Sequence, residues 1–225
     1  MNEYDHLVFS KRMLRVPTLF VLVIWVVYWI EIKFGYNFNA YGIYPRDFMG
    51  LRGIFLSPFI HGDAKHVLNN SIPLFVLSLS LMYFYQSVAR KVLILGTLLT
   101  GFLTWIIARE SFHIGASGVV YLLFSFIFFS GIFRSHFRLI ALSLMTIFLY
   151  GSMIWFLFPV EGRISWEGHL SGFVVGLLFA FLFRKIGIVK EEFQFSQTEF
   201  DLMFDENGNL IENKDTETIK PTSDE

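Results

Sequence analysis

The sequence contains no cysteine at any of its 225 positions, and it has few charged residues. The absence of cysteine excludes a disulfide framework, a thiolate nucleophile and metal sites with cysteine ligands. Charged residues make up 16% of the chain, whereas soluble domains carry about 25%. Hydrophobic residues account for 54% and aromatic residues for 19%, a composition that is typical of a membrane protein.

The few charges are unevenly distributed along the chain. Residues 191–225 hold 11 of the 19 acidic side chains and only two lysines, so the net charge of −1 averages a basic, apolar body and an acidic tail. The net charge therefore gives no sign of a nucleic-acid partner, and we expect none. The tail is short and polar, which predicts disorder. A brief amphipathic segment at 193–204 near the membrane is the alternative.

Six long stretches without Asp, Glu, Lys or Arg define the expected fold. A helix needs about 20 apolar residues to cross a hydrocarbon core about 30 Å thick. Four stretches have this length, and the first and last reach it by extending into flanking residues at the membrane surface. We therefore predict an all-α polytopic membrane protein with a bundle of six transmembrane helices. The stretches are 16–30, 67–89, 92–108, 111–133, 139–160 and 168–183.

The basic residues predict the orientation of this bundle. Lysines and arginines are in excess on the side that holds both ends of the core, and positively charged loops favour the cytoplasm. We therefore expect an N-in/C-in topology in the cytoplasmic (plasma) membrane. The predicted division of the chain is a short basic cytoplasmic N-terminus over 1–15, a six-helix core over 16–186 and an acidic cytoplasmic tail over 187–225.

A long connection separates the first two stretches. Residues 35–65 are rich in aromatic residues and glycine. Aromatic side chains such as tyrosine favour the headgroup layer of a membrane. We therefore predict that this large loop is partly embedded in the outer leaflet, with a flexible external loop as the alternative.

Polar residues enter the membrane at the start of three stretches, at ends that the predicted topology places on the outer face. Polar groups in lipid are costly and usually face the bundle interior or a water-filled cavity. Taken singly, the serine could be a packing residue, and the histidines could bridge neighbouring helices or loops. Their convergence favours a shared polar site. The motifs HVLNN, GASGVVY and WEGHLSG supply His66, Asn70, Ser117 and His169.

Glycines recur every four residues in the last stretch. Small residues at this spacing let membrane helices approach closely, so we interpret these glycines as structural. We predict that the helix over 168–183 packs on the helix over 111–133, which would bring His169 close to Ser117. The glycines of this stripe are Gly168, Gly172 and Gly176.

Two further glycines, Gly115 and Gly118, flank the serine. A helix that begins at Ser117 and ends near Phe133 would rise about 25 Å, less than the thickness of the membrane core. Its outer end would then lie below the surface, and Gly115 would let the preceding backbone bend down to it. The N-terminus of such a helix presents unpaired N–H groups that can stabilise an oxyanion.

The motifs GASG, HVLNN and GHLSGFVVG together resemble those of the rhomboid intramembrane serine proteases. The resemblance implies a catalytic dyad without cofactor or metal, in which Ser117 is the nucleophile and His169 the general base. It implies that His66 and Asn70 support the oxyanion and that Tyr121 stacks on the catalytic histidine.

This resemblance extends over roughly residues 16–186, with one departure. The first loop of the family usually carries a Trp-Arg pair, whereas this chain has Leu51 and Arg52. No acid is expected to complete a triad, because Glu167 lies two residues before His169 and so points to a different helix face. The implied reaction is hydrolysis of single-span membrane proteins near the outer ends of their transmembrane segments, with these substrates and membrane lipids as partners.

Three other functions are alternatives. A proteolytically inactive, rhomboid-like scaffold that binds membrane clients would be expected to lack Ser117 or His169, and both are present. A transporter or channel would carry ionisable residues near the middle of the membrane, whereas here the polar residues gather at one face. A metalloprotease would need an H-E-x-x-H motif, which is absent, although four histidines could approach the outer side: His61, His66, His113 and His169.

Overall fold

The structure, a computed structural model, describes residues 7–159, 164–189, 200, 203–205 and 207–211. The chain divides into two units, Met1–Lys190 and Glu191–Glu225, and the site discussed below lies wholly within the first. Most of the predicted acidic tail over 187–225, including nearly all of 193–204, lies outside the described residues, as does the beginning of the predicted N-terminal segment over 1–15.

Helices form nearly all of the regular structure in the described residues, and the only β-type contacts there are two isolated bridges. Short 3-10 helices precede, extend or connect several of the α-helices. The α-helices are α1 (Arg15–Phe34), α2 (Gly53–Leu56), α3 (Ala64–Phe84), α4 (Ala89–Ile107), α5 (Ser117–Arg134), α6 (Phe137–Tyr150) and α7 (Trp166–Leu182). The 3-10 helices are η1 (Lys11–Leu14), η2 (Asn39–Tyr41), η3 (Met49–Arg52), η4 (Ser57–Phe59) and η5 (Gly151–Leu157).

Five helical segments within the described part of the chain are long and apolar enough to cross a membrane. The sixth expected helix, α7, is apolar but has only 17 residues, so the predicted count of six spans stays a prediction. The five segments are Lys11–Phe34, Ala64–Phe84, Ala89–Ile107, Ser117–Arg134 and Phe137–Leu157.

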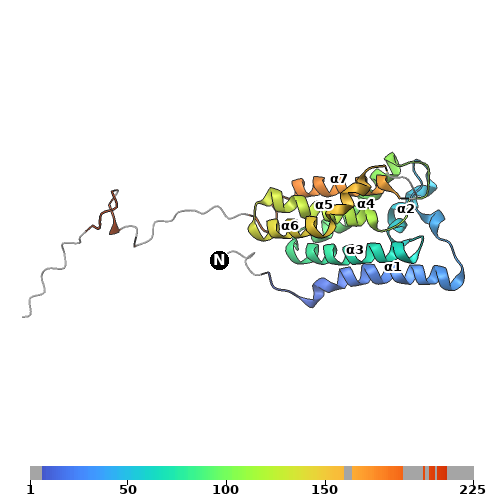
Figure 1. The fold of residues 1–225 in the computed structure, drawn as a ribbon, viewed down its shortest axis with the longest axis horizontal. Coiled ribbons are helices and arrows are strands. Elements are labelled where there is room, and N and C mark those ends of the chain that lie inside the picture. Colours follow the sequence, from blue (N-terminus) through green and yellow to red (C-terminus); the bar gives the residue numbers. More distant parts are fainter. Residues whose placement is uncertain (1–6, 160–163, 190–199, 201–202, 206, 212–225) are drawn as a thin grey trace, which may run out of the picture. The chain divides into compact units, whose positions relative to one another are not determined.

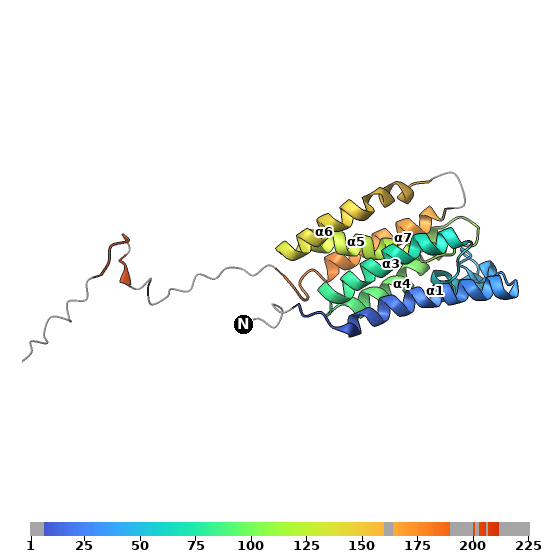
Figure 2. The ribbon, with the colours of Figure 1, turned by 60° about the horizontal axis from the view of Figure 1, so that its bottom comes forward.

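The central helix of the bundle is α5. Within its most apolar 18-residue window 67% of the residues are buried, against 11% for the segment that contains α1 and 17% for the segment that contains α6. It packs against α3, α4, α6 and α7. In Figures 1 and 2, α1 lies at one edge of the bundle beside α3, and α6 lies at the opposite edge in Figure 2. The edge helices therefore expose more of their apolar residues than the central helix does.

Glycines bring α5 and α7 into backbone contact. A Cβ atom added at Gly172 would collide with the carbonyl oxygen of Gly118, and one at Gly176 would collide with the next turn of α5. A Cβ at Gly118 would lie 3.4 Å from the carbonyl oxygen of Gly168. The predicted packing of these two helices is thus confirmed. The Cβ position of Gly168 itself faces Ser165 rather than α5.

The expected helix over 139–160 is interrupted. The α-helix α6 ends at Tyr150, and the chain continues as the 3-10 helix η5 from Gly151 to Leu157. A 3-10 turn rotates successive carbonyl groups differently from an α-helix. This change releases two backbone carbonyls for the site described below.

Candidate active site

The side chains of Ser117 and His169 meet at the ends of α5 and α7. Ser117 is the first residue of α5, and it follows Gly115, whose φ of 104° lies in the left-handed region that favours glycine. His169 lies in the first turn of α7 and is 8% exposed. The Nε2 atom of His169 is 3.0 Å from the Oγ atom of Ser117, a hydrogen-bond distance. The structure therefore brings together the two residues that the sequence singled out.

The imidazole of His169 is held from its other nitrogen. Its Nδ1 atom is 3.0 Å from the carbonyl oxygen of Phe156 in η5. A carbonyl oxygen only accepts, so Nδ1 carries the proton and donates it there. The lone pair of Nε2 then faces the hydroxyl of Ser117, which donates. This is the tautomer that a general base requires.

Tyr121 covers one face of the same imidazole. The two rings are stacked, with 4.3 Å between their centroids and 14° between their planes. The Tyr121 hydroxyl donates to the carbonyl oxygen of Met153 at 2.6 Å. Met153 and Phe156 both belong to η5, so one short segment holds both stacked rings. Sequence reasoning missed this segment, because a continuous apolar run does not show where an α-helix becomes a 3-10 helix; Gly151 was the only signal.

Donors from α3 approach the backbone just before the serine. His66 and Asn70 lie one turn apart, and Asn70 is 5% exposed. The Nδ2 atom of Asn70 has no hydrogen-bond partner, although it is buried. A Cβ placed on Gly115 would lie 2.6 Å from the Nε2 atom of His66 and 3.6 Å from Nδ2 of Asn70. The absence of a side chain at this glycine thus leaves a small space lined by polar groups from α3.

His61, which the sequence offered as a possible metal ligand, contacts the backbone before Ser117 and the ring of His66. Its Nε2 atom accepts the backbone N–H of Ala116 at 3.3 Å, and its ring meets that of His66 edge-on at 4.9 Å. Burial and, to a lesser extent, the neighbouring His66 lower the pKa of His61 to about 4, so it is neutral at pH 7. Within the described residues no group of three or more His, Asp or Glu side chains could hold a metal ion.

The segment between α4 and α5 is bound to the loop before α3. The backbone of His113 exchanges two hydrogen bonds with Ile43, of 2.8 and 3.0 Å, and the N–H of Gly115 donates to the carbonyl of Ser57 at 2.9 Å. The loop over 35–65 therefore supports the segment that leads to Ser117. In its interior Arg52 stacks over the ring of Tyr41, with 4.5 Å from its Cζ atom to the ring centroid.

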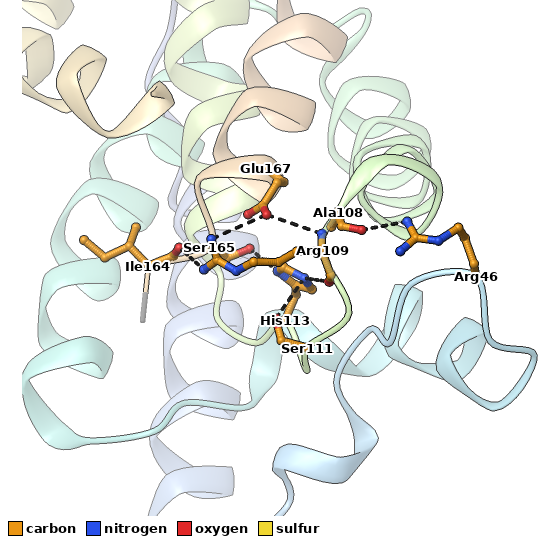
Figure 3. Close-up of polar contacts among 8 residues, drawn as sticks. All are labelled: Arg46, Ala108, Arg109, Ser111, His113, Ile164, Ser165 and Glu167. Atoms are coloured by element: carbon orange, nitrogen blue, oxygen red, sulfur yellow. Dashed lines mark hydrogen bonds and ion pairs between the residues drawn. The ribbon is translucent and has the colours of Figure 1, made fainter. Parts of the chain in front are cut away.

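A buried carboxylate lies near the dyad but turns away from it. Glu167, whose side chain is 3% exposed, accepts the backbone N–H of Arg109 at 3.3 Å and pairs with its guanidinium at 3.5 Å (Figure 3). Arg109 also donates to the carbonyl oxygen of Ile164 at 2.7 Å. These contacts tie the end of α4 to the beginning of α7. They leave the imidazole of His169 paired with a backbone carbonyl rather than with an acid.

A cavity of about 920 Å³ opens over the serine and the histidine. Ligand pockets commonly measure about 300–1,000 Å³, so the space is large enough for an extended peptide segment. The residues that line it include Ser117, His169, Tyr121, His66 and Asn70. A second, small cavity of about 40 Å³ lies behind Ser117, against threonines of α4.

Comparison with known proteins assigns the family. A model of the rhomboid domain matches residues 49–186, which is more than half of the chain. The chain belongs to the rhomboid family. An uncharacterised protein of Mycobacterium tuberculosis is 31% identical to this rhomboid over 172 residues, which cover 72% of each chain. An uncharacterised protein of Mycobacterium leprae is 33% identical over 159 residues, 63% of this chain and 61% of its own.

Family membership and composition agree on the setting of this rhomboid. The matched region contains four helical segments that are long and apolar enough to cross a membrane, namely α3, α4, α5 and the segment formed by α6 and η5, and it also contains α7. The chain is therefore a rhomboid-family integral membrane protein with several spans. The matched range begins after α1, which lies outside it.

Proposed function

We propose that this rhomboid is an intramembrane serine endopeptidase in which Ser117 is the nucleophile and His169 the general base. One observation carries the proposal. A serine hydroxyl lies 3.0 Å from an imidazole nitrogen whose tautomer is set by a backbone carbonyl. A serine becomes an effective nucleophile when such a base is positioned to take its proton.

The reaction begins with attack of Ser117 Oγ on the carbonyl carbon of the scissile peptide bond, while its proton passes to Nε2 of His169. The resulting oxyanion needs donors that are already in place. The first backbone N–H groups of α5 have no intrahelical acceptor, and the unpaired Nδ2 atom of Asn70 lies beside Gly115, two residues before the serine. His66 lies next to it.

Breakdown of this tetrahedral intermediate reverses the proton path. The proton on Nε2 of His169 passes to the leaving amine, the peptide bond breaks, and the new N-terminus departs. A water from the open cavity then gives a proton to Nε2 and attacks the carbonyl carbon of the acyl-enzyme. The bond from this carbon to Ser117 Oγ breaks, the proton on Nε2 returns to Oγ, and the carboxylic acid product leaves. The stack with Tyr121 and the bond to Phe156 keep the ring in one orientation through both halves of the reaction.

The substrates are single-span membrane proteins. The cavity lies at the N-terminal end of α5. The chain that leads to Ser117 is hydrogen-bonded there to the loop over 35–65. In the N-in/C-in, six-span topology this end is the outer one, and cleavage occurs near the outer end of the substrate helix. Glycine or proline there would help the substrate to unwind for attack.

Reconstitution in liposomes with a generic single-span substrate tests this function. The wild-type chain is expected to cut the substrate and to react with a fluorophosphonate, and Ser117→Ala to do neither. Ser125→Ala is the matched control, because it removes another hydroxyl from α5 that bonds to the carbonyl of Phe173 instead. Equal cleavage by wild type and Ser117→Ala would refute the proposal, and capture of the substrate without cleavage would favour the inactive scaffold.

The natural lack of cysteine makes the topology testable with single-cysteine variants. Lys65→Cys in the first turn of α3 and Arg90→Cys in the first turn of α4 both replace exposed residues. In oriented cells a membrane-impermeant maleimide is expected to label the cysteine at 65 and not the one at 90. The reverse labelling would contradict the proposed orientation.

A further inference from the structure

A polar cluster beside the dyad connects the segment before Ser117 to the start of α7 (Figure 3). The Nδ1 atom of His113 lies 2.5 Å from the Oγ atom of Ser165, and its Nε2 atom lies 3.0 Å from the carbonyl oxygen of Arg109. Because a carbonyl only accepts, Nε2 of His113 carries the proton. Its Nδ1 lone pair is then the acceptor for the hydroxyl of Ser165.

The ring of His113 is well suited to this role. It is 4% exposed, and its backbone is anchored to Ile43 by the two hydrogen bonds described above. Burial is the main effect that lowers the pKa of His113, so the ring is neutral at pH 7 and keeps its accepting lone pair. The hydroxyl of Ser165 therefore meets a fixed partner.

Ser165 is at the N-cap position of α7, but its side chain does not cap the helix. A serine at this position normally accepts a backbone N–H of the first turn, an interaction worth about 1 kcal/mol. Here the hydroxyl turns to His113 instead. Its backbone carbonyl still accepts the N–H of His169 at 3.2 Å.

His113 and Ser165 each lie the same number of residues before one member of the dyad. His113 precedes Ser117 by four residues, and Ser165 precedes His169 by four residues. One side-chain hydrogen bond therefore ties the segment that leads to the nucleophile to the segment that leads to the base. The Arg109–Glu167 contact makes a second tie between the same two regions.

We propose that His113 is a positioning residue, which sets the separation between the Oγ atom of Ser117 and the Nε2 atom of His169 through its hydrogen bond to Ser165. The inference rests on the proposed protease function. The tightest glycine contact between α5 and α7 is at Gly172, about one turn further along α7, whereas a Cβ at Gly118 would meet the carbonyl oxygen of Gly168 only at an ordinary van der Waals distance. Without the tie the first turn of α7 can shift about the contact at Gly172, and small shifts lengthen the path of proton transfer.

Ser165→Ala gives the sharpest test, because it removes one hydroxyl and no packing volume of note. In the full-length chain reconstituted with the generic single-span substrate, kcat is expected to fall about 3- to 10-fold with KM unchanged, the size of one hydrogen bond. Ser165→Thr restores the hydroxyl and is expected to recover kcat. Ser80→Ala is the control, since it removes a helix hydroxyl that contacts only its own α3 backbone.

Variants of the histidine separate the hydrogen bond of Nδ1 to Ser165 from the contacts of Nε2, which are with the carbonyl oxygen of Arg109 and the hydroxyl of Ser111. The side chain of asparagine places a polar atom near the position of Nδ1, and that of glutamine places one near Nε2. His113→Asn is therefore expected to retain more kcat than His113→Gln. In a double-mutant cycle, Ser165→Ala should lower kcat little further once His113→Ala is present, because each change removes the same hydrogen bond between the two residues.

The outcomes distinguish this inference from the function on which it rests. Wild-type kcat in Ser165→Ala, or fully additive losses in the cycle, would overturn the positioning role while Ser117→Ala stays inactive. Loss of kcat in Ser165→Thr equal to that in Ser165→Ala would overturn it as well. Failure of the wild-type chain to hydrolyse the substrate or to react with the fluorophosphonate would instead overturn the proposed function.

Discussion

The two ends of α5 are joined to neighbouring parts of the chain by different kinds of polar contact. At its N-terminal end neutral side chains meet beside a cavity of about 920 Å³, where Ser117 Oγ and His169 Nε2 lie 3.0 Å apart. At its C-terminal end Arg134, which is 3% exposed, donates to backbone carbonyls that follow α7, those of Phe183, Ile186 and Ile188.

The difference reflects what each end has to do. The guanidinium of Arg134 always carries its proton, its partners are backbone carbonyls, and its Cζ atom lies 5.2 Å from the ring centroid of Tyr85. Positive charge also suits the C-terminal end of α7. Such a contact stabilises the bundle but has no proton to exchange. The other end keeps a neutral, exchangeable pair and unfilled space, which are the conditions for chemistry.

The largest expected effect is at the reactive end. His169→Ala removes the proposed general base, and kcat for hydrolysis is expected to fall by about 10⁴-fold, since proton transfer by a positioned base contributes about 10²–10⁴-fold. Hydrolysis of the reconstituted substrate measures the change. Retention of more than a tenth of wild-type kcat would contradict the role given to His169.

Removal of an unpaired donor is expected to have the next largest effect. Asn70→Ala deletes the buried amide whose Nδ2 atom has no partner in the resting structure. If this amide binds the oxyanion, kcat falls about 10²–10³-fold, with KM and the thermal midpoint little changed. Asn69→Ala, the adjacent and exposed amide on α3, is the matched comparison for folding and stability. Comparable kcat in wild type and Asn70→Ala would remove this residue from the mechanism.

The opposite end should respond in stability rather than in rate. Arg134→Met leaves three carbonyl oxygens without their donor, and the free energy of unfolding is expected to fall by about 3 kcal/mol. Below the new midpoint kcat should stay within about twofold of wild type, because the site lies at the other end of α5. Arg138→Met, which changes a less buried arginine that lies over Phe137, is the control. A large loss of kcat at unchanged stability in Arg134→Met would contradict the view that this end of α5 serves stability and the other end serves catalysis.

Acid is expected to give the smallest effect, through His61. Its folded pKa of about 4 lies below the unfolded value of 6.5, so the unfolded chain binds more protons between these values. The contribution of His61 to the free energy of unfolding is therefore fully present above pH 6.5 and is lost as the pH falls toward 4. The loss between pH 7 and 5.5 is about 1 kcal/mol. His61→Gln keeps an acceptor for Ala116 without titrating. Thermal midpoints with the same pH dependence in both chains would contradict this assignment.

Much of the bundle could be predicted from the sequence, because the thickness of the membrane core sets the length of apolar sequence that a spanning helix needs. The expected start of one helix at Ser117 and the close contact at Gly172 and Gly176 follow from local rules about small residues. The division of the expected helix over 139–160 into α6 and η5 did not follow, because apolar residues are equally compatible with both geometries. The sequence therefore did not predict the carbonyl groups of Phe156 and Met153 as partners of His169 and Tyr121.

The sequence by itself determined that the chain is an apolar helical membrane protein and that its polar residues are concentrated near the ends of a few helices. Composition and spacing along one helix carry that information. Only the tertiary structure decided which nitrogen of His169 faces Ser117, that Ser165 turns from its helix to His113, and that Glu167 pairs with Arg109. These choices depend on atoms from segments up to 58 residues apart, and a hydrogen bond between such segments leaves no periodic trace in either one.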